Sequence, residues 1–341
     1  FSQGRTGRFI ANVSNVDTVE AISTYEVQFN LRAPSPIFIR AITVYTPSIF
    51  DSTELMAHAT DDDPYATEWL KSNFAGFGPY YVDTFNPGQQ VIFKANPNYW
   101  EGVPFFTTIV YQAVPEPANR VALLLAGQVD YIEAPSQQQL VELSGDGSVK
   151  VQSVAGNLQA RLMVNANFPP FDDVRVRQAL IYALDQDQLV QTAFQGIGTP
   201  AKSPVPPSFP CYTDEGWIYS HDTAKAQELL ADAGYADGID LTLTYSDTRP
   251  FDEPLAVQAQ AQWAAAGINV ELQKIPNDEM SARVATGTRD IPFFAFFEQS
   301  IVLDPGYLFF LTSLPAGAGN RNDYSNDDVS ALVEQANASL D

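Results

Sequence analysis

The segment from residue 239 to residue 272 constrains the fold of this chain more than any other part of the sequence. Apolar and polar residues alternate over 239–245 and again over 268–272, which predicts two strands. Between them, residues 253–266 form a predicted helix that ends at Gly267. Two strands joined in this way are parallel, with a right-handed crossover. The fold class is therefore predicted to be α/β.

Other segments also alternate between predicted strands and helices. Residues 291–297 are almost all apolar, which favours a central strand buried on both faces. Prolines make residues 199–210 an extended loop. Further strands are predicted at 25–31, with one face buried, and at 80–82, 91–93, 108–113 and 129–132. Helices are predicted at 117–127, 173–184, 185–194, 223–233 and 326–336. The predicted N-caps are Asp172 or Asp173, Asp222 and Asn326.

The charge of the chain argues against several classes of partner. Lys and Arg total 18 and Asp and Glu total 41, so the formal net charge is −23. Nucleic acids and anionic membrane surfaces need a basic footprint, and we expect neither as a partner. No stretch reaches the ~18 apolar residues of a transmembrane helix. The sequence starts at Phe1 without a signal peptide, so we interpret it as a mature or cut-down segment, and the missing signal does not argue for the cytoplasm.

The sequence lacks motifs for catalysis and for cofactor binding. Its two histidines, His58 and His221, are not in a zinc-type spacing, and Cys211 is the only cysteine. There is no Walker-type phosphate loop and no nucleophile elbow. Residues 196–201 nominally fit a dinucleotide fingerprint, but they follow a predicted helix and Pro200 prevents a new one. Acidic residues are too abundant for any pair to indicate acid–base catalysis. We therefore expect no metal, no cofactor and no enzymatic activity.

Arg249 is the residue best placed to bind a ligand. It lies in a loop after the predicted strand 239–245, and ligands of α/β sheets bind beyond the carboxyl ends of the strands. A guanidinium group there can hold a carboxylate through two parallel hydrogen bonds. The alternative is an ordinary salt bridge with one of the 41 acidic residues. Four phenylalanines either line an aromatic cleft or pack in the core: Phe293, Phe294, Phe296 and Phe297.

Four motifs, in a fixed order over nearly the whole chain, give it a resemblance to a known family. They are the glycine-rich turn Gly76–Tyr80, the N-P-x-Y-W turn Asn96–Trp100, the stretch Pro170–Leu180 and the D-x-x-K-A helix Asp222–Gly234. Each is weak alone, but together they are specific. The chain resembles the extracytoplasmic solute-binding proteins of peptide/nickel ABC importers, a class that includes dipeptide-, oligopeptide- and nickel-binding proteins.

This resemblance implies a periplasmic-binding-protein (Venus flytrap) fold, in which two α/β lobes are joined by hinge strands and carry an extra N-proximal subdomain. Residues 1–75 would end that subdomain, 76–160 would form part of lobe one, and 161–341 would form most of lobe two. The rest of lobe one, the final return strands and a secretory or lipoprotein signal would lie outside this sequence. The resemblance also implies a monomer, periplasmic or lipid-anchored, that delivers a small solute to an ABC permease in the membrane.

The resemblance also implies roles for particular residues. Dipeptide-binding members grip the peptide carboxylate with an arginine in an R-P-[YF] context, which Arg249-Pro250-Phe251 matches. They hold the ligand's amino group with an aspartate four residues before the proline of a D-P or E-P pair. The pair here is Asp304-Pro305 and the corresponding residue is Ile301, which cannot bind an ammonium ion. Glu298 is the nearest acidic substitute. We expect the pocket walls to include Tyr245, Phe251 and Phe297.

The Ile301 substitution keeps several ligands open. The leading prediction is a receptor for a peptide-like or other carboxylate-bearing solute. A receptor of the same family for a metal chelate, an oligosaccharide or an opine is the alternative. A secreted hydrolase belongs to a different class, because it would turn its substrate over, whereas a receptor binds its solute stoichiometrically and forms no product.

Overall fold

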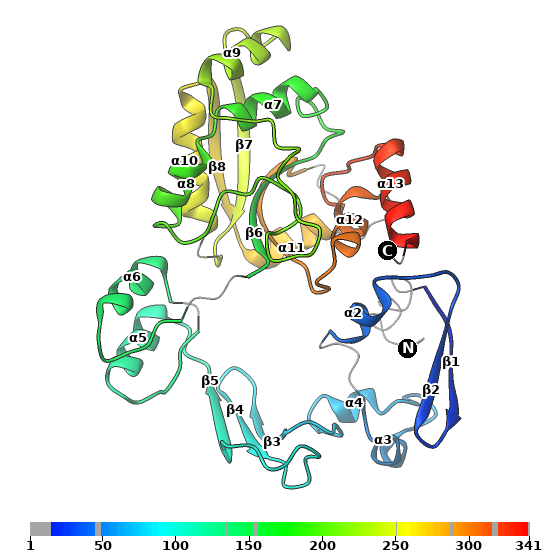
Figure 1. Ribbon diagram of the computed structural model, residues 1–341. Coiled ribbons are helices and arrows are strands. Elements are labelled where there is room, and N and C mark those ends of the chain that lie inside the picture. Colours follow the sequence, from blue (N-terminus) through cyan, green and yellow to red (C-terminus); the bar gives the residue numbers. More distant parts are fainter. Residues whose placement is uncertain are drawn as a thin grey trace. The chain divides into compact units, whose positions relative to one another are not determined.

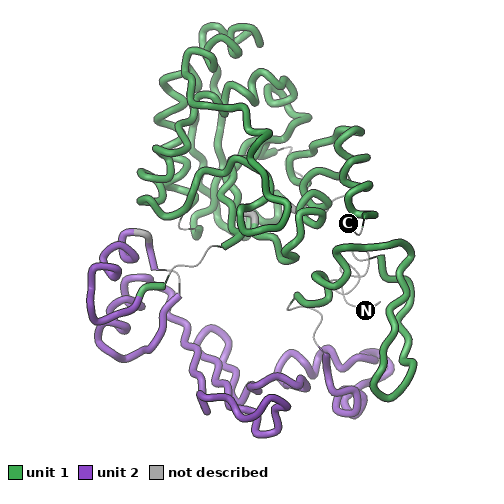
Figure 2. Tube along the Cα trace, in the orientation of Figure 1, with its two compact units in different colours: residues 1–44, 151–341 green, residues 45–150 purple. Residues whose placement is uncertain are grey.

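The protein is described by a computed structural model that covers residues 15–44, 49–133, 135–152, 156–249, 251–286, 290–315 and 320–339. The chain divides into two compact units (Figure 2). Unit 1 consists of Phe1–Val44 and Val151–Asp341, and unit 2 of Tyr45–Lys150. Among the described residues, no helix has the length and apolar character that crossing a membrane requires.

The centre of unit 1 is a four-stranded sheet with the strand order β6-β9-β7-β8 (Figure 1). β7 (Ile239–Ser246) is parallel to β8 (Ile268–Ile275) and to β9 (Phe293–Gln299). β6 (Leu158–Val164) lies at the edge and is antiparallel to β9. The α/β class, the parallel pair at 239–272 and the central position of the apolar run at 291–297 are confirmed.

The parallel pair begins with two closely spaced glycines. Gly238 precedes β7 with a φ of +98°, and Gly267 precedes β8 with a φ of +80°. The N–H of Ile239 donates to the carbonyl oxygen of Gly267 at 3.0 Å. A Cβ added to Gly238 would lie 2.7 Å from that same oxygen, so the chain can begin both strands here only because residue 238 has no side chain.

Four helices cover one face of this sheet and form the main core with it: α7 (Val174–Tyr182), α8 (Gln186–Ala193), α9 (Thr223–Asp232) and α10 (Asp252–Ala264). Trp263 of α10 is 1% exposed, and its Nε1 donates to the carbonyl oxygen of Leu180 on α7 at 2.9 Å. The first three helices start at aspartates whose side chains accept backbone hydrogen bonds, namely Asp173, Asp185 and Asp222.

The helix α11 (Asn277–Thr286) packs against the opposite face of the sheet. The second core contains Met163 of β6, Met280 of α11 and Phe294 of β9, with Phe296 packed against it. Successive residues of a strand point to opposite faces, so Phe293 belongs to the main core while Phe294 and Phe296 lie on the α11 face. The run of phenylalanines is therefore divided between two environments.

Unit 1 also contains a hairpin and three further helices: β1 (Val16–Ser23), β2 (Glu26–Leu31), α2 (Phe38–Ile42), α12 (Pro305–Ser313) and α13 (Asp327–Ala338). Asn326 caps α13 as predicted. A third apolar cluster contains Ala41 of α2 and Tyr307 of α12, with Ile301 packed against it. Arg40 joins the same two segments, because its Nη1 donates to the carbonyl oxygen of Leu303 at 2.6 Å and lies 3.2 Å from the Asp304 carboxylate.

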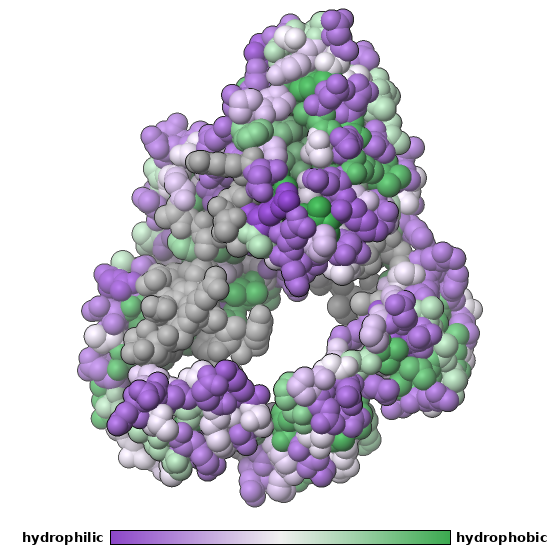
Figure 3. Space-filling model, turned by 180° about the vertical axis from the view of Figure 1, so that it is seen from behind, coloured by the Kyte–Doolittle hydropathy of each residue, from purple (hydrophilic) through white to green (hydrophobic). Residues whose placement is uncertain are grey.

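Unit 2 contains an antiparallel three-stranded sheet and four short helices: β3 (Tyr80–Asn86), β4 (Gln90–Ala95), β5 (Thr108–Gln112), α3 (Ser52–His58), α4 (Thr67–Leu70), α5 (Pro117–Leu125) and α6 (Gln137–Gly145). The predicted hairpin at 80–93 and the strand at 108–113 are confirmed. Several large apolar side chains of this unit are exposed, including Phe105 at 92% and Trp100 at 79%. On the face drawn in Figure 3, hydrophobic residues form scattered patches between hydrophilic ones.

Three sequence predictions about these elements were wrong or incomplete. Residues 129–132 form no strand, since they follow α5 as irregular chain. The strand at 25–31 exists, but its predicted buried face is wrong at Tyr25 and Val27, which are 98% and 58% exposed. The edge strand β6 was not predicted. Apolar and polar residues do not alternate regularly along β6, because the polar Gln159 and Arg161 share a face with the apolar Met163.

Candidate ligand-binding site

The candidate site lies where β7 and β9 end. The loop of residues 247–251 connects β7 to α10 and carries Arg249. β9 runs parallel to β7 in the neighbouring position of the sheet. Because the carboxyl ends of parallel strands meet at one edge of a sheet, this loop is close to the last residues of β9. Arg249 therefore lies beyond the carboxyl end of a parallel strand, which is the position predicted from the sequence.

The guanidinium group of Arg249 lies over an aromatic ring of β9. Its Cζ is 5.0 Å from the centre of the Phe296 ring, within the range of a cation–π interaction. Its Nη1 is buried and has no hydrogen-bond partner. No ion pair joins Arg249 to a carboxylate among the described residues. A buried donor without an acceptor costs about 1–3 kcal/mol, so this nitrogen suits an acceptor that a ligand would supply.

A second guanidinium group contacts the same ring. The Cζ of Arg321 lies 4.3 Å from the centre of the Phe296 ring. Asn320 precedes the turn that carries it, and its Nδ2 donates to the carbonyl oxygens of Leu314 at 3.1 Å and Tyr324 at 2.8 Å, while its Oδ1 accepts from the Tyr324 N–H at 3.0 Å. Arg321 is thus supported by a turn that is hydrogen-bonded on both sides.

A third arginine is next to Phe296 across the β6–β9 pair. Arg161 is directly opposite Phe296 in the antiparallel register, so the two side chains are on the same face. Its Nη2 donates to Oε1 of Gln159 and to the carbonyl oxygen of Pro204 at 3.3 Å. The site therefore gathers three cations in a chain whose net charge is −23.

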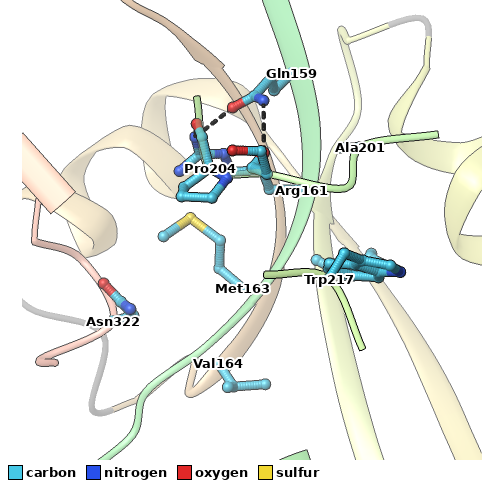
Figure 4. A pocket seen from close by; sticks show the side chains of 10 residues that line it. Gln159, Arg161, Met163, Val164, Ala201, Pro204, Trp217 and Asn322 are labelled. Atoms are coloured by element: carbon cyan, nitrogen blue, oxygen red, sulfur yellow. Dashed lines mark hydrogen bonds between the residues drawn. The ribbon is translucent and has the colours of Figure 1, made fainter. Parts of the chain in front are cut away.

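A hollow of about 380 Å³ extends along β6 from this cluster. Figure 4 shows Gln159, Arg161 and Pro204 gathered at one end of it. Asn322, the neighbour of Arg321, also lines the hollow, and its buried Oδ1 has no hydrogen-bond partner. The remaining lining residues are Leu162, Met163, Val164, Ala201, Ser203 and Trp217.

Asp252 closes the loop that carries Arg249. Its Oδ2 accepts from the Ser246 N–H at 3.1 Å, and its own N–H donates to the Arg249 carbonyl oxygen at 3.2 Å. The residue is fully buried, and burial raises its pKa from 3.8 to about 6, although the Ser246 hydrogen bond and the Arg249 charge act in the opposite direction. Asp252 thus fixes the backbone from which the Arg249 side chain extends.

The aromatic residues predicted to wall the pocket lie on the other face of the sheet. Phe251 packs against Phe297 with ring centres 5.4 Å apart, and against Phe194 at 5.9 Å. Tyr245 is 5% exposed within the main core, and its hydroxyl donates to Glu253 at 3.4 Å. Burial raises the pKa of Tyr245. The structure thus brings Phe251 and Phe297 together, while the ring that contacts Arg249 belongs to Phe296.

The predicted site residue Glu298 is described only through its backbone. Glu298 pairs through its backbone with Gln159 in the β6–β9 ladder, but its side chain is outside the described part of the structure. Pro250 of the R-P-F motif is outside the described residues too. Ile301 packs against the apolar cluster of α2 and α12. Its side chain offers no negative charge to an ammonium group.

A second hollow, of about 430 Å³, lies between the loop after β7 and the start of α10. Arg249 lines it together with Ser246, Asp247, Thr248, Glu253, Pro254, Val257 and Gln258. No group of three or more His, Cys, Asp or Glu side chains suited to a metal ion occurs in the part of the chain that is described. The side chains that line the two hollows carry guanidinium, carboxylate, hydroxyl, amide and aromatic groups.

The sequence did not single out Arg161, Arg321 or Phe296 as partners of Arg249. Arg321 is separated from Arg249 by 72 positions and approaches it only through the fold of the chain after β9. A continuous run of phenylalanines has no periodicity, so it does not indicate which ring faces which side. Lys and Arg are few in this acidic chain, so the positions of its arginines were the sequence signal that could have indicated the site.

A family model described as bacterial extracellular solute-binding proteins, family 5 Middle, matches residues 3–318 of the chain. Among curated proteins, heme-binding protein A of Haemophilus influenzae is 28% identical over 323 residues, which cover 94% of this chain and 58% of that protein. Glutathione-binding protein GsiB of Escherichia coli is 27% identical over 332 residues, covering 94% of this chain and 63% of that protein. The chain thus spans less than two thirds of the length of these relatives.

Solved structures share the fold. The periplasmic binding protein DppA from Helicobacter pylori, in complex with the peptide STSA, has a TM-score of 0.84 at 22% identity, over 100% of this chain and 67% of that one. MoaA from Agrobacterium tumefaciens, in complex with mannopinic acid, has a TM-score of 0.80 at 22% identity, over 97% of this chain and 66% of that one. The α/β fold predicted from the sequence is thus that of periplasmic binding proteins.

Proposed function

Because the chain belongs to family 5 of the bacterial extracellular solute-binding proteins, we propose that the whole protein is the substrate-binding subunit of an ABC importer. In this proposal it captures a small solute outside the cytoplasm, either in the periplasm or from a lipid anchor, and delivers it unchanged to the membrane permease. It acts as a monomer. Residues 1–75, 76–160 and 161–341 would contribute to the extra subdomain, lobe one and lobe two of a two-lobed receptor.

The observation that carries the proposal is the state of Arg249. Its guanidinium group sits at the carboxyl end of β7, is oriented by Phe296 and keeps one buried nitrogen without an acceptor. Such a group is suited to bind a ligand carboxylate. The proposed solute is therefore peptide-like or another carboxylate-bearing molecule. Binding would stabilise a closed arrangement of the lobes through contacts with both of them.

Glu298 has a separate place in this proposal. Dipeptide-binding members have an aspartate at the position that Ile301 occupies here. If the solute carries an ammonium group, Glu298 would bind it instead. The matched probes are Ala-Ala and N-acetyl-Ala-Ala, which differ in that group. Glu298→Gln should weaken Ala-Ala by about tenfold, the loss of one charge-assisted hydrogen bond, and leave the acetylated peptide unchanged. Equal affinities of the variant and the wild type for Ala-Ala would remove Glu298 from the site.

A receptor for a metal chelate, an oligosaccharide or an opine is the second candidate. Ile301 favours it, because this side chain is packed among apolar residues and offers no partner to an ammonium ion. Opines and chelates with carboxylates would be bound by Arg249 in the same way. An oligosaccharide without a carboxylate would leave the guanidinium group of Arg249 without an anionic partner.

Released solute provides the test. The full-length protein is purified without added ligand, denatured, and its bound solute identified by mass spectrometry; titration calorimetry with that solute then gives the stoichiometry. One intact solute per protein is the expected result, and its formula separates a peptide from the second candidate. Conversion of the solute into a product would indicate a hydrolase instead and reject the receptor.

A further inference from the structure

A buried carboxylate lies directly behind the proposed carboxylate-binding group. Asp252 is fully buried in the first turn of α10. Its N–H donates to the Arg249 carbonyl oxygen at 3.2 Å, and its Oδ2 accepts from the Ser246 N–H at 3.1 Å. These two hydrogen bonds fold the loop after β7 around the Asp252 side chain. The Asp252 carboxylate and the Arg249 guanidinium group therefore belong to one short loop, at the edge of the hollow of about 430 Å³ that Ser246 and Arg249 line.

Each of these two charged groups keeps one buried atom without a partner. Nη1 of Arg249 has no acceptor, and Oδ1 of Asp252 has no donor. The two atoms do not compensate each other, since neither bonds to the other. A ligand carboxylate at Arg249 would supply the acceptor that Nη1 lacks, but it would bring a second negative charge near Asp252 and no donor for Oδ1. A buried carboxylate is sensitive to such an added charge, because little water screens it.

The Arg249 charge favours the ionised form of Asp252. Burial raises the pKa of Asp252 to about 6, against the lowering effects of the Ser246 hydrogen bond and of the Arg249 charge. A ligand carboxylate bound by Arg249 would offset that positive charge and add a negative one. Both changes disfavour the ionised carboxylate, so the pKa of Asp252 would rise further on binding. Binding of the anion and binding of a proton are then linked, and each strengthens the other.

The other charged groups of the loop respond differently to pH. Glu253 accepts from Lys274 at 2.8 Å, and this hydrogen bond lowers the pKa of Glu253. Asp247 is exposed, so water and salt screen it from a bound anion. Arg161 and Arg321, on the Phe296 side of the sheet, keep their protons at every pH used here, because guanidinium groups are not deprotonated in proteins.

One other group near α10 titrates in the same pH range. His221 lies 4.0 Å from the carboxylate of Asp185, which caps α8, and α8 packs against α10. It therefore serves as the control for the pH dependence. The elements packed against α10 also carry Asp187 on α8, Asp240 and Tyr245 on β7, Glu271 on β8, and Glu298 on β9.

We propose that Asp252 takes up a proton when a ligand carboxylate binds to Arg249, so that the site binds anionic solutes more tightly in mildly acidic than in neutral medium. This inference rests on the proposed receptor function and makes Asp252 a positioning residue whose charge controls the affinity. The proton comes from the solvent and forms an O–H bond at Oδ1, since Oδ2 already accepts from Ser246. No bond of the ligand forms or breaks.

Titration calorimetry in buffers of different ionisation enthalpy measures this proton directly. The probe is N-acetyl-Ala-Ala, which has no amino group and whose carboxylate is ionised above about pH 5. Full-length protein, freed of bound solute by unfolding and refolding, should take up about half a proton per ligand at about pH 6.5. The Kd should rise about tenfold from about pH 5 to about pH 8, as expected if binding raises the pKa of Asp252 by about one unit. Binding without proton uptake, or an affinity that increases with pH, would overturn the inference.

Variants assign the proton to one residue. Asp252→Asn imitates the protonated carboxyl with nearly the same shape. At about pH 8 it should bind N-acetyl-Ala-Ala about tenfold more tightly than wild type, with a Kd that no longer depends on pH, whereas a merely structural role would weaken binding at every pH. His221→Gln should keep the wild-type pH dependence and proton uptake. Their loss in His221→Gln, or their persistence in Asp252→Asn, would show that another group takes up the proton. The wild-type measurement decides the question even if Asp252→Asn does not fold.

The outcomes separate failure of this inference from failure of the receptor function. Binding of N-acetyl-Ala-Ala without pH dependence would overturn the proton linkage and leave the receptor intact. If the protein binds neither N-acetyl-Ala-Ala nor formate while it still captures another solute, Arg249 does not bind carboxylates and the inference falls with that role. Chemical conversion of the captured solute would reject the receptor itself.

Discussion

The buried carboxylate of Asp252 accepts a 3.1 Å hydrogen bond from the backbone N–H of Ser246, at the point where β7 ends and the Arg249 loop begins. Its second oxygen has no partner. The charge of this carboxylate is therefore poorly compensated, and this has a measurable effect on stability.

Asp252 should make the protein less stable as the pH rises from about 4 to about 6. Its pKa is raised from 3.8 to about 6 by burial, so the folded state holds the proton more tightly than the unfolded state in this window. The contribution of Asp252 to the free energy of unfolding therefore falls as the pH increases towards 6 and then levels off, by about 2–3 kcal/mol in total. Urea unfolding of Asp252→Asn and wild type should show the stability of the variant, relative to wild type, rising across the window. A constant difference would contradict the prediction, and exposed Asp237→Asn is the control.

Gly238→Ala should destabilise unit 1. The new Cβ would lie 2.7 Å from the Gly267 carbonyl oxygen at a φ of +98°, which adds a steric clash to an unfavourable backbone conformation. A loss of about 2–3 kcal/mol in the free energy of unfolding is expected. Gly216→Ala is the matched control, since nothing lies within 4 Å of its added Cβ. Equal denaturation midpoints for the two variants would show that the strands can separate without cost.

Trp263→Phe should weaken the packing of α10 against α7. The substitution removes the 2.9 Å hydrogen bond to the Leu180 carbonyl and leaves part of a fully packed position empty. We expect a loss of about 2–4 kcal/mol, measured by chemical denaturation. Trp100→Phe, at a position that is 79% exposed, should change the midpoint little. A similar small change for both would argue against the described contact.

Phe296→Leu should weaken ligand binding more than Phe297→Leu does. Phe296 contacts the guanidinium groups of Arg249 and Arg321, whereas Phe297 packs against Phe251 on the other face of the sheet. Loss of the aromatic face should raise the Kd by about tenfold, as estimated for partly desolvated cation–π contacts. Titration of both variants with the released solute makes the comparison. A larger effect at Phe297 would favour the pocket wall predicted from the sequence.

The sequence predicted the parts of the fold that local patterns determine. Strands 239–245 and 268–272 alternate cleanly, and a helix between them dictates that they are parallel. β6 escaped prediction because Gln159 and Arg161 lie on its inner side near the site, which breaks the expected pattern of an apolar face. Hydrophobic patterning fails where polar residues face a functional hollow.

The sequence predicted where Arg249 lies, in the loop after β7, but not which side chains surround it there. Its R-P-F context made it a candidate ligand contact, and that role stays a prediction. Phe296 and Arg321 depend on register and on the path of the chain after β9, which residue types do not encode locally. A shift of one residue in β9 would exchange Phe296 and Phe297 between faces, and no pattern in the sequence distinguishes these alternatives.

The order β6-β9-β7-β8 also has a consequence for how the chain acquires its structure. β9 lies between β6 and β7 and is the last of these four strands to be synthesised. A nascent chain therefore keeps β6 unpaired within this sheet until residues 293–299 have left the ribosome, and the pairing that completes the sheet spans more than a hundred positions. Such distant pairing forms slowly. Translation can thus run well past β8 while the sheet of unit 1 is still open.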